Sequence, residues 1–220
     1  MSVNVAAKVK RLVQSLVHKL FRVSTARGVH RYHNVQSLLL KRRFLDVEMN
    51  KAFKDCGTVL EIGAGLFEQL RFVSPKIVRV GVEIFLPYIE HRVCDSKCIC
   101  VHYDALKIDE LFVDNSFDAV MMIDVLEHFE RQDALRLLEK VQRIAKKKLF
   151  LFVPEGIHPQ HKDDRGFGND YYMSHRSTWY AEDLMQLGFH VEVWGDYHHQ
   201  EGKESGAMIC IKNLGKLEHE

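Results

Sequence analysis

The stretch Thr58-Val-Leu-Glu-Ile-Gly-Ala-Gly65 decides the fold class of this chain. Its apolar, β-branched run is too short to span a membrane and predicts a buried strand. Gly63 and Gly65 come directly after the run, and glycine lets the backbone turn sharply and approach a ligand closely. The acid Glu61 stands just before this turn. The stretch therefore predicts a strand that leads into a ligand-binding turn.

Three further apolar runs are each followed by an acidic residue. Residues 77–82 are followed by Glu83, residues 98–103 by Asp104, and residues 117–123 by Asp124. In an open parallel sheet, ligands bind beyond the carboxyl ends of the strands, and an acid after the second strand can accept hydrogen bonds from a ribose. Ionised acceptors make the stronger hydrogen bonds. Four strand ends with acids thus predict a nucleotide-like ligand on an α/β sheet.

The order of these motifs resembles the class I S-adenosylmethionine-dependent methyltransferases. The resemblance covers roughly residues 55–212, and it rests on Glu-Ile-Gly-Ala-Gly, Glu83, His-Tyr-Asp-Ala, and Phe-Asp-Ala-Val-Met-Met-Ile-Asp-Val-Leu-Glu-His-Phe around the fourth strand. It implies an α/β, Rossmann-like, doubly wound and mostly parallel seven-stranded sheet with an antiparallel C-terminal hairpin strand. The last two strand-like runs have no helix between them, which independently indicates a hairpin.

Two other nucleotide ligands fit less well. A dinucleotide site requires Gly-x-Gly-x-x-Gly, and Glu68 occupies the third glycine position. A phosphate-binding loop requires Gly-Lys-Ser/Thr, which the sequence lacks. Methyltransferases of this family often carry a glycine where this chain has Phe67. We therefore expect the Phe67 ring to narrow the pocket over the methionine part of the cofactor.

The resemblance implies S-adenosyl-L-methionine as the cofactor. Glu61 and the two glycines would lie along its methionine part, Glu83 would bind its ribose, and Asp104 would accept from its adenine amino group. The predicted cofactor-binding residues are Glu61, Gly63, Gly65, Glu83, Ile84, Asp104, Ala105, Asp124 and Val125.

Two histidines are candidates for a catalytic base. His128 follows the fourth strand, and imidazole titrates near neutral pH. His158 lies in the long polar and aromatic segment 155–177, which we expect to cover the active site as a lid. The alternatives are a structural role for His128 and a divalent metal in the 158–164 loop, bound by its histidines and aspartates. We assign no metal ligand.

Composition limits the function classes. The formal net charge is +1, which argues against a general nucleic-acid surface and favours a small-molecule acceptor. Five cysteines and no secretory signal indicate a reducing, cytoplasmic setting. Cys94, Cys98 and Cys100 cluster without the usual zinc spacing, so buried apolar thiols are the favoured interpretation. No run is long enough for a transmembrane helix.

The chain is expected to have three parts: an N-terminal helical leader and cap over residues 1–54, the cofactor-binding domain over 55–214, and a C-terminal tail over 215–220. Residues 4–23 predict a basic amphipathic helix that packs on the domain or on a second copy, or that contacts a membrane surface. Residues 24–34 predict a polar loop whose Arg27, Arg31, Tyr32 and His33 either reach the cofactor and substrate or only connect. A helix over 35–54 follows.

Beyond the first strand, we expect helices over 66–73, 87–93, 133–146 and 178–187. A fifth strand over 149–153 should end at Pro154, because proline cannot donate a ladder hydrogen bond. Residues 189–194 and 207–211 should form the final hairpin, with His198 and His199 in its loop.

The predicted function is methyl transfer from S-adenosylmethionine to a small or medium-sized acceptor, through an oxygen, nitrogen or carbon atom. Asp-Val-Leu-Glu after the fourth strand replaces the Asn-Pro-Pro-Tyr type of motif, which argues against methylation of DNA bases or glutamine. The alternative is a non-catalytic module with the same fold, which binds the cofactor or assembles through its N-terminal helix.

Overall fold

The computed structural model describes residues 22–26, 29–33, 38–200 and 203–215. The predicted amphipathic helix over 4–23 lies outside the described residues except for its last two positions. None of the helices within the described ranges is long and apolar enough to cross a membrane.

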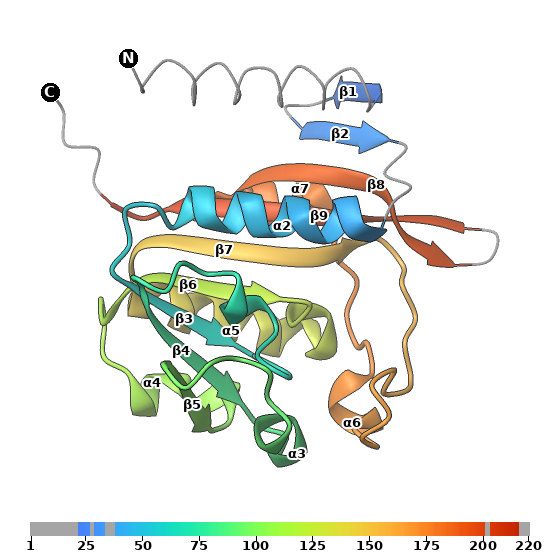
Figure 1. Ribbon diagram of the computed structural model, residues 1–220. Helices are drawn as coiled ribbons and strands as arrows, with labels where there is room; N and C mark the ends of the chain where they lie inside the picture. Colours follow the sequence, from blue (N-terminus) through green and yellow to red (C-terminus); the bar gives the residue numbers. More distant parts are fainter. Residues whose placement is uncertain (1–21, 27–28, 34–37, 201–202, 216–220) are drawn as a thin grey trace, which may run out of the picture.

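A nine-stranded mixed sheet runs through the molecule in the order β1-β2-β8-β9-β7-β6-β3-β4-β5 (Figure 1). The strands β3 to β7 are parallel to their neighbours within that group, and β9 is antiparallel to both β7 and β8. The seven strands from β3 onward therefore form the predicted sheet with its antiparallel hairpin strand. Their bounds are β3 (Thr58–Ile62), β4 (Val78–Glu83), β5 (Cys98–His102), β6 (Phe117–Ile123), β7 (Ala145–Glu155), β8 (His190–Gln200) and β9 (Lys203–Asn213).

Two extra strands extend this sheet at one edge. β1 (Arg22–Ala26) and β2 (Val29–His33) form an antiparallel hairpin, and β2 pairs in parallel with β8. The prediction of a polar loop over residues 24–34 is therefore wrong. The β8 edge offers unpaired backbone groups, and pairing with it gives a polar segment a strand conformation that its own hydrophobic pattern does not indicate.

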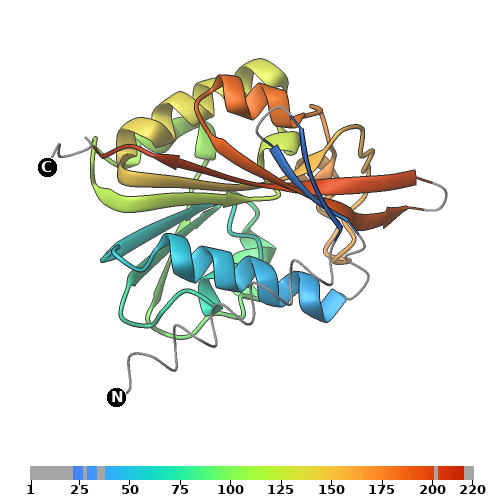
Figure 2. The same ribbon diagram turned by 90° about the horizontal axis from the view of Figure 1, so that it is seen from above.

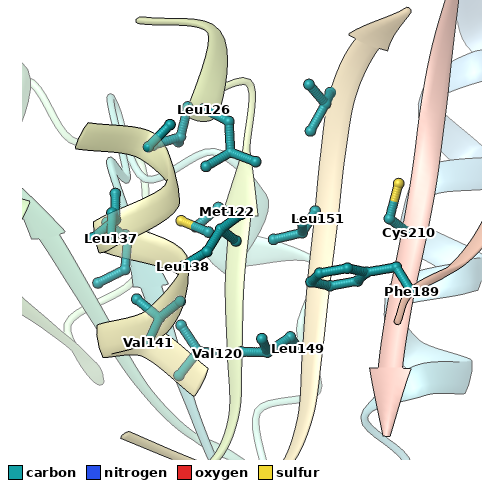
Figure 3. Close-up of a cluster of buried hydrophobic side chains, with 14 of the residues drawn as sticks. Val120, Met122, Leu126, Leu137, Leu138, Val141, Leu149, Leu151, Phe189 and Cys210 are labelled. Atoms are coloured by element: carbon teal, nitrogen blue, oxygen red, sulfur yellow. The ribbon is translucent and has the colours of Figure 1, made fainter. Parts of the chain in front are cut away.

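Helices cover both faces of the sheet. α2 (Leu38–Ala52) lies on one face, and α5 (Arg131–Ile144) and α7 (Ala181–Gln186) lie on the other (Figure 2). The short helices are α3 (Leu86–Glu90), α4 (Ile108–Leu111) and α6 (Asp170–Met173). Because side chains alternate along a strand, β6 and β7 supply both cores. Val120 and Leu151 face α5, whereas Met121 and Phe150 face α2. Figure 3 shows the α5 side of this packing.

Three predicted elements differ in extent. The expected helix over 66–73 is mostly turn, with only a 3-10 turn, η1 (Gln69–Arg71). The final hairpin is longer than expected, so His198 and His199 lie in β8, opposite Ser205 and Glu204. The expected helix over 178–187 shortens to α7, and Gly188 follows it with φ +85° as a helix cap.

Pro154 does not end the fifth strand, since β7 continues to Glu155 and Pro154 pairs with Ala207 of β9. The carbonyl oxygen of Phe152 accepts a hydrogen bond from the backbone N–H of Asp124, so the backbone groups of Phe152 face β6. Directions along a strand repeat every two residues, so the backbone nitrogen of Pro154 also faces the β6 side. β6 has ended by that point, because its last pair joins Ile123 and Phe152. The missing N–H of proline therefore removes no ladder hydrogen bond.

Candidate active site

A cavity of about 880 Å³ lies at the carboxyl ends of β3, β4, β5 and β6. Segment 156–177, which contains α6, forms another part of its wall, and Figure 1 shows this segment on the side toward which β3 and β4 point. All residues that the sequence predicts for the cofactor and for catalysis line this one cavity. They are Glu61, Gly63, Gly65, Glu83, Ile84, Asp104, Ala105, Asp124, Val125, His128 and His158.

The turn after β3 requires its two glycines for different reasons. Both have positive φ angles, +65° at Gly63 and +54° at Gly65. A Cβ atom at Gly63 would lie 2.8 Å from a methyl carbon of Val125, so the next strand end packs against bare backbone there. At Gly65 no atom lies within 4 Å of such a Cβ atom. The backbone of Gly65 is therefore open to the cavity, as a ligand lying against main chain requires.

Phe67 adopts a backbone conformation that favours glycine, with φ +61°. Its side chain is fully buried, and it does not line the cavity. The ring lies over Gly81 of β4, where an added Cβ atom would lie only 2.4 Å from a ring carbon. The expectation that Phe67 narrows the pocket is therefore wrong, because the ring packs into the core on the α2 side.

The Glu83 carboxylate joins the glycine turn to the end of β4. One oxygen accepts from the backbone N–H of Gly65 at 2.8 Å, and the other accepts from that of Phe85 at 2.8 Å. Burial raises the pKa of Glu83 above its ordinary value, although these backbone donors oppose the shift. The two backbone N–H groups hold the carboxylate at the cavity wall, and each oxygen keeps a second lone pair for a ligand hydroxyl.

Glu61 lies deeper. Its side chain is 1% exposed, and one carboxylate oxygen has no hydrogen-bond partner. Burial, followed by the charges of Glu83 and Glu68, raises the pKa of Glu61 well above its ordinary value. A buried oxygen without a partner costs stability, so its persistence at a cavity wall indicates a ligand group that it contacts.

The other two acids, Asp104 and Asp124, differ in their surroundings. Asp104 caps the 3-10 turn η2 (Ala105–Lys107) by accepting from the backbone N–H of Leu106 at 2.9 Å. Asp124 has φ +51° and is open to the cavity although protein surrounds it. The surrounding protein raises the pKa of Asp124 above its ordinary value by desolvation. The strained backbone at the end of β6 turns the chain toward η3 (Leu126–His128).

A cluster that the sequence did not predict lies beside Asp124. Glu127, His128 and His175 each offer a ligand atom, and these atoms lie within 4.8 Å of one another. Burial, and then the neighbouring His175, lower the pKa of His128 to about 4, so its ring is neutral at neutral pH. Glu127 is 2% exposed, and neither of its carboxylate oxygens has a partner. Sequence reasoning missed this cluster because His175 is 47 positions from His128.

The cavity segment 156–177 is organised by Asp163. Its carboxylate accepts from the Tyr88 hydroxyl at 2.7 Å and from the backbone N–H groups of Arg165, Phe167 and Asn169 at 2.9, 2.7 and 3.1 Å. The Phe167 ring packs edge-on against Tyr88, with the ring centroids 5.4 Å apart. The segment is therefore fixed to α3 through the Asp163 carboxylate, the Phe167 ring and the Arg165 guanidinium, which lies over the Tyr88 ring.

This arrangement changes the candidates for a metal. Asp163 is already committed to internal hydrogen bonds, and His161 and Asp164 are exposed. Among the described residues, the 158–164 loop does not gather its ligand atoms, whereas Cys94, Cys98 and Cys100 do, within 4.8 Å. Burial is the main reason that the pKa of the Cys98 thiol is raised and that of Cys100 reaches about 11. Such thiols stay protonated, in keeping with the predicted apolar role.

Comparison with known proteins agrees with this geometry. Residues 60–153 match a family model described as "Methyltransferase domain". This part of the chain is therefore similar to a methyltransferase domain. S-adenosylmethionine is the cofactor of this family, and the matched residues span β3 to β7, whose carboxyl ends form much of the cavity wall. No curated protein sequence matches the chain closely enough to serve as a relative.

Solved structures share the methyltransferase fold. A SAM-dependent methyltransferase from Archaeoglobus fulgidus is 21% identical, with a TM-score of 0.56 over 79% of this chain and 93% of its own. The magnesium protoporphyrin IX methyltransferase of Synechocystis PCC 6803, solved with bound SAH, is 12% identical, with a TM-score of 0.51 over 79% of this chain and 84% of its own. At these identities the likeness concerns the fold.

Proposed function

We propose that this protein binds S-adenosylmethionine in the cavity and transfers its methyl group to a small or medium-sized acceptor. The observation that carries the proposal is the convergence of four strand-end acids on one cavity beside the open backbone of Gly65. A volume of about 880 Å³ is within the range of pockets that enclose a cofactor-sized ligand.

The cofactor is proposed to lie across the carboxyl ends of β3, β4 and β5. Glu83 would accept from the ribose hydroxyls, and Asp104 and Ala105 would contact the adenine. Gly63, Gly65 and the unpartnered oxygen of Glu61 would lie along the methionine part, whose ammonium group can donate to that oxygen. Ile84, Asp124 and Val125 would form the remaining walls around the cofactor.

The acceptor is proposed to enter beneath segment 156–177, beside the end of β6. This side of the cavity contains His128, His158 and His175, and its rim contains Tyr171, which is 73% exposed. A rim of tyrosine and histidine suits a compact acceptor with both polar and apolar parts. The near-neutral net charge of the chain also favours such an acceptor over a nucleic acid.

The chemistry asks little of the protein beyond positioning. The sulfonium donor is already activated, so transfer needs an acceptor atom in line with the methyl carbon and little water around it. If the acceptor carries a proton, His128 and His158 are the proposed groups that take it. Burial lowers the pKa of both rings, so both are neutral near pH 7, which is the protonation state that a base requires.

Calorimetry tests the cofactor site. We expect S-adenosylmethionine to bind the parent protein and the Glu83→Gln variant to bind about 10- to 100-fold more weakly, because an amide nitrogen cannot accept the ribose hydrogen bonds. Glu90→Gln is the matched control, since Glu90 is exposed on α3 and does not line the cavity. Absent binding by the parent, or equal binding by parent and Glu83→Gln, would overturn the proposed site.

Turnover separates an enzyme from a non-catalytic module of the same fold. We expect formation of S-adenosylhomocysteine when fractionated small-molecule extracts are added to the parent protein. A protein that binds the cofactor with the expected dependence on Glu83 and never turns over with broad pools would favour the module. Phe67 packs in the core and does not line the cavity, so its ring is no obstacle to cofactor binding.

A further inference from the structure

We propose that Glu127, His128 and His175 bind a divalent transition-metal cation at the acceptor side of the cavity. Their ligand atoms lie within 4.8 Å of one another, and all three residues line the cavity. Two ligands about 2.1 Å from one ion are at most about 4.2 Å apart, so the observed cluster needs only a small contraction to bind one.

Glu127 is the strongest single reason for this assignment. Its side chain is 2% exposed, and both carboxylate oxygens are buried without a hydrogen-bond partner. Its backbone carbonyl, in contrast, accepts from the N–H groups of Arg176 at 2.7 Å and Ser177 at 3.1 Å, so the residue is held firmly in place. A fixed, buried and unpartnered carboxylate is costly unless a cation or a donor completes it.

The two histidines are held in the orientation that metal ligands require. Nδ1 of His175 lies 2.5 Å from the carbonyl oxygen of His158, and Nδ1 of His128 lies 3.4 Å from that of Ser174. A carbonyl can only accept, so Nδ1 of His175 carries the proton and its Nε2 keeps its lone pair. The His128 ring lies beside two backbone carbonyls, those of Ser174 and Asp124. Metal-binding histidines commonly donate their second ring N–H to such a carbonyl, which fixes the ring and the tautomer.

The surrounding charges are compatible with a cation. Asp124 and Glu127 both line this part of the cavity, so two carboxyl groups share its wall. The guanidinium of Arg176 donates to the carbonyls of His128, Ser174 and Tyr171 and to no carboxylate among the described residues. Arg176 therefore does not pair with Glu127, whose carboxyl oxygens are left for a ligand.

The donor set indicates the kind of metal. Imidazole nitrogens favour Fe²⁺, Co²⁺ or Zn²⁺ over Mg²⁺ and Ca²⁺, and a carboxylate ligand also suits Mn²⁺. Two histidines with one carboxylate leave open positions on such an ion. An ion here would face the acceptor side, so an acceptor that presents an oxygen atom would complete its coordination. This role rests on the proposed methyl transfer, whereas the binding of the ion does not. His128 would then act as a ligand, and His158 would remain the candidate base.

Metal titration of the whole chain tests the site without any cofactor. Metal-stripped protein is titrated with MnCl₂, with free Mn²⁺ followed by electron paramagnetic resonance, and with CoCl₂, followed by visible absorption. We expect one saturable site in the parent and a loss of affinity of about 10- to 100-fold or more in Glu127→Gln and in His175→Asn. His190→Asn is the matched control, because it removes an exposed histidine of β8 that does not line the cavity.

Two results would overturn the assignment: a parent without saturable binding, or equal affinity in the parent and both ligand variants. Melting curves of each metal-free variant show whether it is folded. If Glu127→Gln is not folded, the affinity of His175→Asn alone decides the test. Because no S-adenosylmethionine is present, this outcome is independent of the calorimetric test of Glu83. Metal binding without cofactor binding would thus refute the proposed function and leave the metal site intact.

Discussion

At the scale of the residue, Phe67 combines an unfavourable backbone with a favourable side chain. Its φ of +61° costs roughly 1–2 kcal/mol for a residue with a Cβ atom. Full burial of a phenylalanine ring contributes about 3–5 kcal/mol relative to alanine. The burial term is larger, which explains how an aromatic residue can occupy a position that favours glycine. Gly81 provides the space for the ring.

Replacement of Phe67 by glycine should therefore destabilise the fold and spare the cofactor site. We expect Phe67→Gly to lose about 1–4 kcal/mol of unfolding free energy, since the lost burial exceeds the relieved strain. Affinity for S-adenosylmethionine should stay within about twofold, because the ring does not line the cavity. Denaturant unfolding and calorimetry measure the two effects. A large loss of affinity with unchanged stability would contradict this account.

The contrast between the acids and Phe67 shows what the sequence could predict at this scale. The acids at the ends of β3, β4, β5 and β6 follow from strand position alone, because parallel strands bring their carboxyl ends to one edge. The direction of the Phe67 side chain depends on the positive φ at that residue and on the space over Gly81, neither of which is visible in a one-dimensional pattern. His175 reaches His128 only through the path of the intervening segment.

At the scale of the element, the Asp163 carboxylate joins segment 156–177 to α3 and to the segment's own backbone. Asp163 accepts four hydrogen bonds, one from α3 and three from the segment's own backbone. Burial is the largest single influence on the pKa of Asp163, and it raises that pKa. The hydrogen bonds together outweigh burial, so the pKa lies below its ordinary value. Length and polarity predicted a covering segment, but they did not predict that it would be fixed to Tyr88.

Replacement of Asp163 by asparagine should loosen this segment without unfolding the domain. The amide nitrogen cannot accept the hydrogen bonds that one carboxylate oxygen accepts, so backbone donors lose their partner. We expect faster proteolysis within 156–177, about tenfold or more, and a melting temperature lower by only a few degrees. Limited proteolysis with mass spectrometry measures the rate.

Asp164→Asn serves as the control for this experiment, because Asp164 is the exposed neighbour of Asp163. Its proteolysis should match that of the parent. Equal cleavage of all three proteins would show that Asp163 does not organise the segment.

Element boundaries were predicted less well than element types, because pairing with neighbouring strands decides where a strand begins and ends. β7 runs through Pro154 because β6 has already ended there. The β1–β2 hairpin forms on the edge of β8, although the segment 24–34 itself is polar. In both cases the deciding contact is with a strand distant in sequence, which local propensity does not contain. The strands from residue 58 onward follow from local patterns and were predicted, whereas the helix expected over 66–73 is mostly turn.

At the scale of the whole molecule, occupation of the cavity should stabilise the fold. A ligand that binds only the native state adds about 2.7 kcal/mol of unfolding free energy at 100 times its dissociation constant. For a domain of this size, this corresponds to a rise in melting temperature of roughly 5–11 °C. We expect this rise with S-adenosylmethionine in the parent and a much smaller one in Glu83→Gln at the same concentration. Differential scanning calorimetry provides the measurement.

A nicotinamide dinucleotide is the matched control ligand, since Glu68 replaces the third glycine of that fingerprint. It should leave the melting temperature unchanged. The dinucleotide and S-adenosylmethionine could instead raise the melting temperature equally. The cavity would then not discriminate between the two ligands, contrary to the assignment.

The pairing of β2 with β8 has a consequence for synthesis on the ribosome. His30 lies opposite Glu192, so the two partners are separated by about 160 residues. At a translation rate of about 5–20 residues per second, the first hairpin waits roughly 8–32 s for the strand it pairs with. The parallel strands between them can assemble during that interval. We therefore expect the outermost edge of the sheet, although it is encoded first, to be completed last.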